Sequence, residues 1–327
     1  MNSVSVQGPL EQRLRALRRS LQRGDIARAS ELLTPAPPVA EAGCRGLRSE
    51  ATQPREGASV VAAARQTTAP APGVGPARKP VPLAEACAGV ETPAPRGGRF
   101  WLIRRELAEV HPKLASLPRQ YAAIIGGARQ RFDELSASAA LCRAADGKPE
   151  DLLFLDIESC GLIPAPVFLV GLMHYAEGQF RFEQFLARDY SEEAAILRAF
   201  AERLSDAQVL VTFNGKSFDM NLLRQRCAFH GVEVPGRLAF HLDLLHESRR
   251  RWRGSVPNCR LQTLEQHLCG RRRVGDIPGA LIAEAYHSFV RSGDARPIAD
   301  ILHHNLLDLL TMGELVCHLL SGAAPTE

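Results

Sequence analysis

Four acidic residues have types and spacings that favour divalent-metal chemistry. Asp156 and Glu158 lie two residues apart, where the apolar run 152–157 ends. Side chains alternate along a strand, so these two carboxylates are expected to project from the same face. Like charges at close range disfavour joint ionisation unless a cation neutralises them. Carboxylate oxygens are hard ligands, so this pair favours Mg²⁺ or Mn²⁺.

Asp219 is the third candidate acid. It follows a second apolar run, 209–213, and is expected in the first turn of a helix. The helix dipole alone favours an acid there, so a structural role stays open. In open α/β sheets, however, sites form at the carboxyl ends of the strands, and this turn would bring Asp219 to that edge.

The fourth acid, Asp308, lies among leucines on an expected long helix. A carboxylate in such surroundings is uncommon without a partner. His304 is four residues earlier and shares the helical face of Asp308. His303 is five residues earlier, about 140° away around a regular helix. This geometry favours His304 as the histidine of the site.

Three further polar residues are weaker candidates. Asn214 could hydrogen-bond a nucleotide and Lys216 could meet a phosphate, although a plain turn or surface role fits each equally well. Asp243 follows the last expected strand. We interpret it as a structural residue that caps the next helix.

Two arginine-rich runs are candidate phosphate contacts. In the run 249–253, Trp252 suggests stacking on a base, but the run fits a solvated helix face with a core tryptophan equally well. The second run consists of Arg271, Arg272 and Arg273. Gly270 and Gly275 flank it and indicate an exposed loop, so nucleic acid is the favoured partner there.

These residues require a sheet to position them. From residue 151 the pattern predicts three strands, a helix, a strand, a helix, a strand and then helices, the last of them near 297–320. The second and third strands form a hairpin around Ala176-Glu177-Gly178. This order predicts an α/β fold with one mixed sheet flanked by helices.

The preceding part of the chain is expected to be less compact. Residues 1–33 contain an amphipathic helical segment, either a small packing element or a helix that binds a protein partner. Half of the prolines, 11 of 22, fall within 34–98, which predicts a disordered linker rich in Pro, Ala and Gly. Residues 99–150 are expected to be a lead-in segment that packs on the main domain, 151–322.

The composition sets further limits. The chain has 327 residues and a formal net charge of +4, which is a sum of +8 over residues 1–150 and −4 over residues 151–327. No stretch approaches the roughly 18 apolar residues of a membrane span. The N-terminus lacks the pattern of a signal peptide. The eight cysteines contain no C-x-x-C pair, so we expect no disulfide framework. Together with the two preceding observations, this predicts a cytoplasmic protein without membrane association.

At this point the sequence resembles the DEDD exonucleases of the ribonuclease H-like superfamily. It is most similar to the YprB-type ribonuclease H-like domain family. The resemblance covers about residues 151–320. It is carried by five ordered segments: Phe154-Leu155-Asp156-Ile157-Glu158, Phe213-Asn214-Gly215-Lys216-Ser217-Phe218-Asp219, His241-Leu242-Asp243-Leu244-Leu245-His246, Gly275-Asp276-Ile277-Pro278-Gly279 and His304-Asn305-Leu306-Leu307-Asp308.

The resemblance implies a metal-dependent 3′→5′ exonuclease acting on single-stranded DNA or RNA ends through two Mg²⁺ or Mn²⁺ ions. The four acids would be the metal ligands. One exonuclease branch has its histidine five residues before the last Asp, which matches His303. The YprB-type pattern His-Asn-x-x-Asp matches His304, which would position or deprotonate the attacking water.

Two other functions fit the same sequence. One is a non-catalytic module that binds nucleic acid or acts as a scaffold, although the intact set of four acids disfavours it. The other is a structure-selective endonuclease on the same fold. The Asp-x-Glu start favours the exonuclease.

Overall fold

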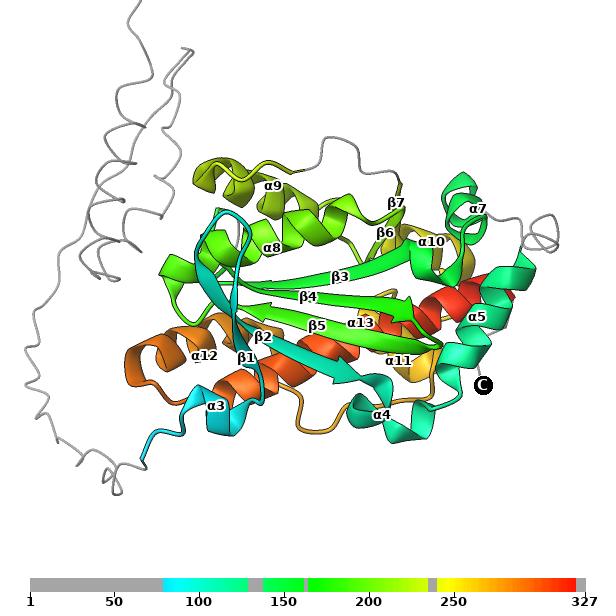
Figure 1. The fold of residues 1–327 in the computed structure, drawn as a ribbon. Coiled ribbons are helices and arrows are strands. Elements are labelled where there is room, and N and C mark those ends of the chain that lie inside the picture. The colour runs from blue at the N-terminus through cyan, green and yellow to red at the C-terminus, as the bar shows by residue number, and fades with distance from the viewer. Residues whose placement is uncertain (1–78, 129–137, 162–163, 235–239, 322–327) are drawn as a thin grey trace, which may run out of the picture. The chain divides into compact units, whose positions relative to one another are not determined.

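The computed structural model describes residues 79–128, 138–161, 164–234 and 240–321. Within these ranges a seven-stranded mixed sheet has helices on both faces (Figure 1), which is the fold class expected from the sequence. Its strand order is β1-β2-β5-β4-β3-β6-β7. The strands are β1 (Val90–Pro93), β2 (Arg99–Glu106), β3 (Leu152–Ser159), β4 (Val167–Ala176), β5 (Gln179–Leu186), β6 (Val209–Thr212) and β7 (His241–Asp243).

Strand β3 lies inside the sheet, between antiparallel β4 and parallel β6. Its residues Leu152–Leu155 are all buried, since helices cover both faces at this position. The register places Asp156 of β3 opposite Gly171 of β4, and Gly171 opposite Gln184 of β5. This row across the sheet lies directly beneath the site described below.

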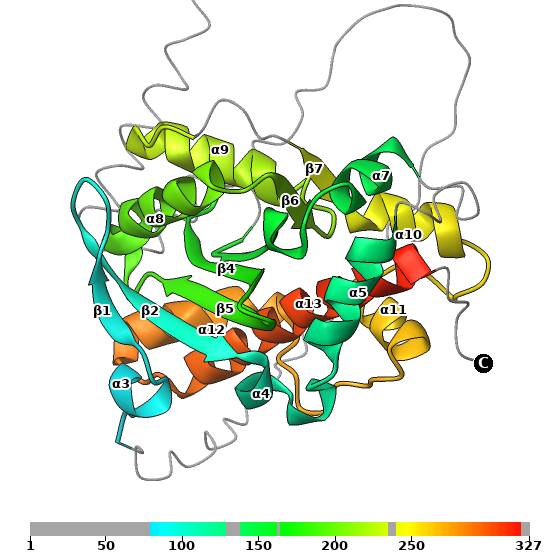
Figure 2. The same ribbon diagram turned by 45° about the vertical axis from the view of Figure 1, so that its right-hand side comes forward.

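Helices form the two outer layers. Helices α8 and α9 cover one face of the sheet, and α13 crosses the other together with α5, α7, α10 and α11 (Figures 1 and 2). The helices are α3 (Leu83–Ala86), α4 (Leu107–Val110), α5 (Leu117–Ala128), α7 (Ala139–Ala145), α8 (Glu193–Ser205), α9 (Asp219–His230), α10 (Leu244–Trp252), α11 (Leu261–Leu268), α12 (Gly279–Ser292) and α13 (Arg296–Ser321). Short 3₁₀ turns lie at Pro112–Leu114, Pro149–Asp151 and Tyr190–Glu192.

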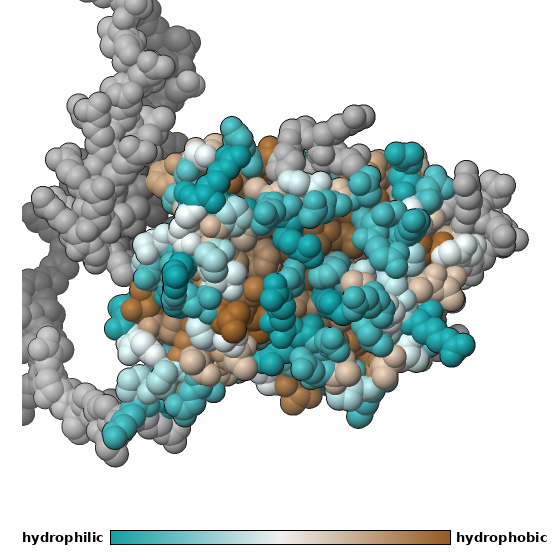
Figure 3. Space-filling view, in the orientation of Figure 1, coloured by the Kyte–Doolittle hydropathy of each residue, from teal (hydrophilic) through white to brown (hydrophobic). Residues whose placement is uncertain are grey.

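Helix α13 is the longest described element, with 26 residues. It packs closely on β4 at Gly313, where an added Cβ would lie 3.0 Å from Cε of Met173. None of the described helices, α13 included, has both the length and the apolar composition needed to cross a membrane. In the view of Figure 3, hydrophilic side chains cover much of the described surface and apolar ones form smaller patches between them.

Two boundaries expected from the sequence are wrong. The predicted linker, 34–98, is too long at its C-terminal end, because α3 and β1 lie within it. Strand β1 pairs with β2 at the edge of the sheet, where a strand tolerates Pro93. The expected lead-in segment, 99–150, supplies β2, an internal strand, as well as helices. The predicted helical segment within 1–33, and the linker up to residue 78, lie outside the described residues.

Burial of His241 predicts an acid-sensitive fold. Burial, with the nearby charges of Lys216 and Arg224, lowers the pKa of His241 to about 4, and its Nε2 lies 2.8 Å from Oγ1 of Thr212. The unfolded chain therefore takes up a proton near pH 6.5 that the folded chain excludes until about pH 4. We expect the contribution of this neutral histidine to stability to be lost as the pH falls across this window.

Urea denaturation at pH 7.5 and pH 4.5 measures this effect. The wild type should lose more unfolding free energy between the two pH values than His241→Gln, which has no titrating ring. Equal losses in the two proteins would contradict the assignment.

Candidate active site

Three elements bring the four acids together. Asp156 and Glu158 project from the same face of β3, Asp219 is the first residue of α9, and Asp308 lies on α13. Charge repulsion within the set raises the pKa values of Asp156, Glu158 and Asp219, and the charge of Asp308 contributes to all three. The structure thus gathers in one place acids from three segments that are far apart in sequence.

The turn before Asp219 is fixed by glycine and by Asp243. A Cβ on Gly215 would overlap the hydroxyl of Thr212, so only glycine allows this close approach. The buried carboxylate of Asp243 accepts backbone N–H bonds from Asn214 at 2.8 Å and Lys216 at 3.0 Å. It also caps α10 by accepting from the N–H of residue 245 at 3.1 Å. The structural interpretation of Asp243 is therefore confirmed.

The carboxyls of the cluster are protonated more readily than free ones. Burial is the largest cause for Asp156 and Glu158, and the charges of Asp308 and Asp219 raise both pKa values further. Burial raises the pKa of Asp219 to about 7, with added repulsion from Asp243 and Asp308. Burial also raises the pKa of Asp308, although Arg273 and His304 act in the opposite direction. The site thus concentrates negative charge where water cannot screen it fully.

A buried amide network, absent from the sequence-based prediction, holds Asp156. Nδ2 of Asn305, on α13, donates to Oδ2 of Asp156 at 2.8 Å. Nε2 of Gln184 donates to Oδ1 of Asn305 at 2.7 Å and to the carbonyl of Leu302 at 2.9 Å. Both amide side chains are almost fully buried. The available signal was the asparagine within His304-Asn305-Leu306-Leu307-Asp308, next to a residue already assigned to the site.

Gly171 makes room for this network, which leads to a prediction. A Cβ at position 171 would overlap the amide of Asn305, whose side chain is fully buried. We expect Gly171→Ala to displace Asn305 from Asp156, to cost about 1–3 kcal/mol of unfolding free energy and to impair the chemistry of the site. Thermal unfolding and a cleavage assay measure the two effects. Gly178→Ala, in the open β4–β5 turn, is the control for cleavage, and wild-type cleavage by Gly171→Ala would contradict the prediction.

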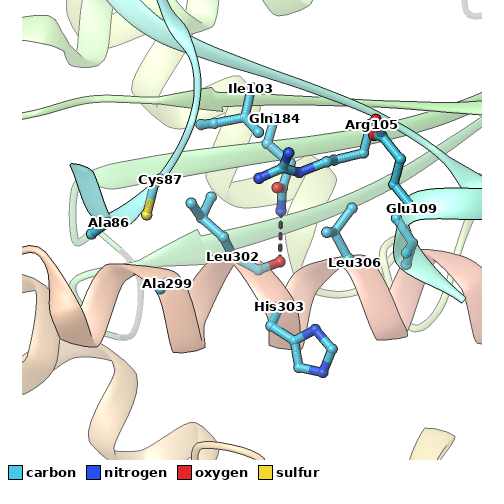
Figure 4. A pocket seen from close by; sticks show the side chains of 11 residues that line it. Ala86, Cys87, Ile103, Arg105, Glu109, Gln184, Ala299, Leu302, His303 and Leu306 are labelled. Atoms are coloured by element: carbon cyan, nitrogen blue, oxygen red, sulfur yellow. Dashed lines mark hydrogen bonds between the residues drawn. The ribbon is translucent and has the colours of Figure 1, made fainter. Parts of the chain in front are cut away.

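The two histidines of α13 have different surroundings. His304 is 8% exposed, its Nδ1 lies 2.8 Å from Oδ1 of Asp276, and its Nε2 lies 3.6 Å from Oδ2 of Asp308. His303 is exposed and lines a separate cavity of about 330 Å³ together with Arg105 (Figure 4). The structure therefore places His304, and not His303, beside the acids.

The expectation for the second arginine run is wrong in two of its three positions. Arg271 is paired with Glu265 and Glu314. Arg273 is held by Glu265 at 2.6 Å, by Asp276 at 3.2 Å and by Asp308 at 2.6 Å. Only Arg272 is exposed as predicted. In this loop alternate side chains turn inward, and buried carboxylates attract the two cations that face them.

The remaining candidates lie as follows. Asn214 and Lys216 are exposed on the turn that leads to Asp219. Trp252 is 1% exposed in the core, so it is not available to stack on a base. Among the described residues, the predicted contacts with exposed side chains are Asn214, Lys216, Arg272 and the arginines of the run 249–253.

The donor set fits a hard divalent cation. Its donors are carboxylate oxygens. Oδ1 of Asp308 is buried, and its partner is Nη2 of Arg273, 2.6 Å away. In the described part of the chain no three His, Cys, Asp or Glu side chains stand at metal-binding distances. The acids therefore form a charged cluster whose side chains would have to draw together around an ion.

The structure thus combines a mixed sheet, helices on both of its faces, and acids that meet from β3, α9 and α13. A family model described as the RNase_H superfamily matches residues 153–320, and the chain belongs to that superfamily.

Two further comparisons found proteins similar to this chain. Over 173 residues the chain is 32% identical to the uncharacterized protein YprB of Bacillus subtilis (strain 168), a match that covers 52% of this chain and 42% of that protein. The YprB-type resemblance is thereby confirmed, although the matched region is less than half of that relative. A family B DNA polymerase from the hyperthermophilic archaeon Pyrobaculum calidifontis matches with a TM-score of 0.42 and 19% identity, covering 50% of this chain and 24% of the polymerase.

Proposed function

We propose that this protein is a metal-dependent nuclease that removes nucleotides from the 3′ ends of single-stranded nucleic acid. The observation that carries the proposal is the meeting of Asp156, Glu158, Asp219 and Asp308 beside His304. Four acids in a buried place are expensive for a fold. Their conjunction is explained if the function requires cations there.

The acids are the proposed ligands of two Mg²⁺ or Mn²⁺ ions. Such ions, when bound, lower the pKa of a water and stabilise the charge on the leaving 3′-oxygen. Asn305 orients Asp156, since its amide Nδ2 donates to Oδ2 of the carboxylate. The exposed Asn214, Lys216 and Arg272 are the proposed contacts to the substrate phosphates and nucleotide.

In the proposed reaction His304 accepts a proton at Nε2 from the attacking water. The water oxygen bonds to phosphorus while the bond from phosphorus to the 3′-oxygen of the shortened strand breaks. That oxygen leaves with the electron pair and is protonated by solvent. Each cycle releases one nucleoside 5′-monophosphate, and a histidine base suits a reaction near neutral pH.

The experiment that tests the function class compares linear and circular strands. Single-stranded DNA and RNA, each in linear and in closed circular form, are incubated with the full-length protein in Mg²⁺, Mn²⁺ or EDTA. An exonuclease degrades the linear strands only. Cleavage of circles would favour the endonuclease instead, and binding without cleavage under either metal would favour the non-catalytic module.

A further inference from the structure

The loop between α11 and α12 supplies a second acid that contacts His304. Asp276 belongs to the segment Gly275-Asp276-Ile277-Pro278-Gly279, to which the proposed reaction assigns no role. Its side chain is 9% exposed, and its Oδ1 lies 2.8 Å from Nδ1 of His304. Gly275, with a φ of +75°, lets the chain turn so that the next residue faces α13.

The other oxygen of Asp276 is held in place. Its Oδ2 receives Nη1 of Arg273 at 3.2 Å and Nε2 of Gln262 at 3.3 Å. Both of these partners can only donate through those atoms. The carboxylate is therefore fixed on one side by two donors and presents its Oδ1 to the imidazole of His304.

This arrangement selects one form of the neutral ring. A carboxylate oxygen only accepts, so Nδ1 of His304 must carry the hydrogen of the bond to Asp276. The lone pair is then on Nε2, which faces Asp308 across 3.6 Å, too far for a direct hydrogen bond. A water placed at the acid cluster would find at Nε2 an acceptor for its proton.

We propose that Asp276 is a positioning residue that holds His304 as the Nδ1–H tautomer, with Nε2 turned toward the acid cluster as the proton acceptor. The catalytic consequence rests on the proposed nuclease function. The tautomer itself depends only on the contacts around Asp276. The proposal therefore has one readout that does not require activity.

Asp276→Asn is the decisive substitution, because it preserves shape and reverses one set of contacts. Arg273 and Gln262 would donate to the oxygen of the new amide. The N–H groups of that amide would then face Nδ1 of His304. The ring would then accept at Nδ1 and carry its hydrogen on Nε2. This substitution in a related acid–histidine arrangement, the serine protease triad, acts through the wrong tautomer.

The first measurement is a long-range ¹H–¹⁵N spectrum of the histidine rings at a pH where His304 is neutral. The signals of His304 are assigned by their absence in His304→Gln. We expect hydrogen on Nδ1 in the wild type and on Nε2 in Asp276→Asn. Hydrogen on Nε2 in the wild type would overturn the proposal whether or not Asp276→Asn folds.

The second measurement is steady-state cleavage. Asp276→Asn should lower kcat by about 10²-fold or more, the typical share of a general base, while KM and Mn²⁺ affinity stay within about twofold. Asp300→Asn makes the same chemical change at an exposed position of α13 and should match the wild type. A wild-type kcat in Asp276→Asn would overturn the catalytic role. An inactive wild type would instead refute the nuclease, and the ring spectrum would still test the tautomer.

Discussion

Asp219→Asn is expected to slow strand cleavage strongly and to stabilise the metal-free fold. Burial, with repulsion from Asp243 and Asp308, raises the pKa of the Asp219 carboxyl to about 7. At pH 8 the ionised wild-type carboxylate therefore weakens the fold, since a raised folded-state pKa means that ionisation favours the unfolded chain. An amide of the same shape removes this charge.

The two effects have opposite signs and are measured separately. In EDTA at pH 8 the variant should gain free energy of unfolding on the order of 1–3 kcal/mol, because one pKa unit corresponds to about 1.4 kcal/mol. In Mn²⁺ its cleavage rate should fall on the order of 10³-fold. Asp206→Asn, at an exposed position after α8, is the matched control and should change neither quantity. A destabilised Asp219→Asn that still cleaves would contradict the assignment of Asp219 to the site.

Of the substitutions proposed here, Arg273→Leu is expected to cause the largest loss of unfolding free energy. The guanidinium lies 6% exposed among Glu265, Asp276 and Asp308 and pairs with all three. Leucine would leave their buried charges without this shared cation. Removing one partner of a buried ion pair typically costs about 3–5 kcal/mol.

Chemical denaturation of the metal-free protein measures the loss. Arg272→Leu is the matched control, because its side chain is exposed and a surface substitution typically changes stability by about 0.5 kcal/mol or less. Equal midpoints for the two variants would show that the buried carboxylates do not depend on Arg273.

The central sheet could be predicted because its signals are local. Apolar runs bounded by turns indicated β3 to β7 in their order, and a last long helix was expected near 297–320, where α13 lies. The N-terminal edge could not be predicted in this way. Strand β1 is short and ends in Pro93, so its composition resembles a linker, and only its pairing with β2 makes it a strand.

The acids were predictable for a similar reason, since Asp156 and Glu158 end an apolar strand. The residues that contact the acids could not be predicted from the sequence. In the sequence, Arg273 has the pattern of a surface cation, but in the structure it pairs with Asp308. Gln184 has the pattern of an ordinary strand residue, but in the structure its amide donates to Asn305. Such roles arise from contacts between segments far apart in sequence, which a pattern along the chain does not contain.

The most direct test of the nuclease centre is digestion of a 5′-labelled linear single strand by the wild type and by Asp156→Asn, in Mn²⁺ and in EDTA. The wild type should give a ladder of products shortened from the 3′ end in Mn²⁺ and no products in EDTA. Asp156→Asn, with its fold intact by circular dichroism, should give no ladder in either buffer. A wild type without metal-dependent cleavage, or a variant with the same ladder, would contradict the assignment of the acid cluster as a nuclease centre.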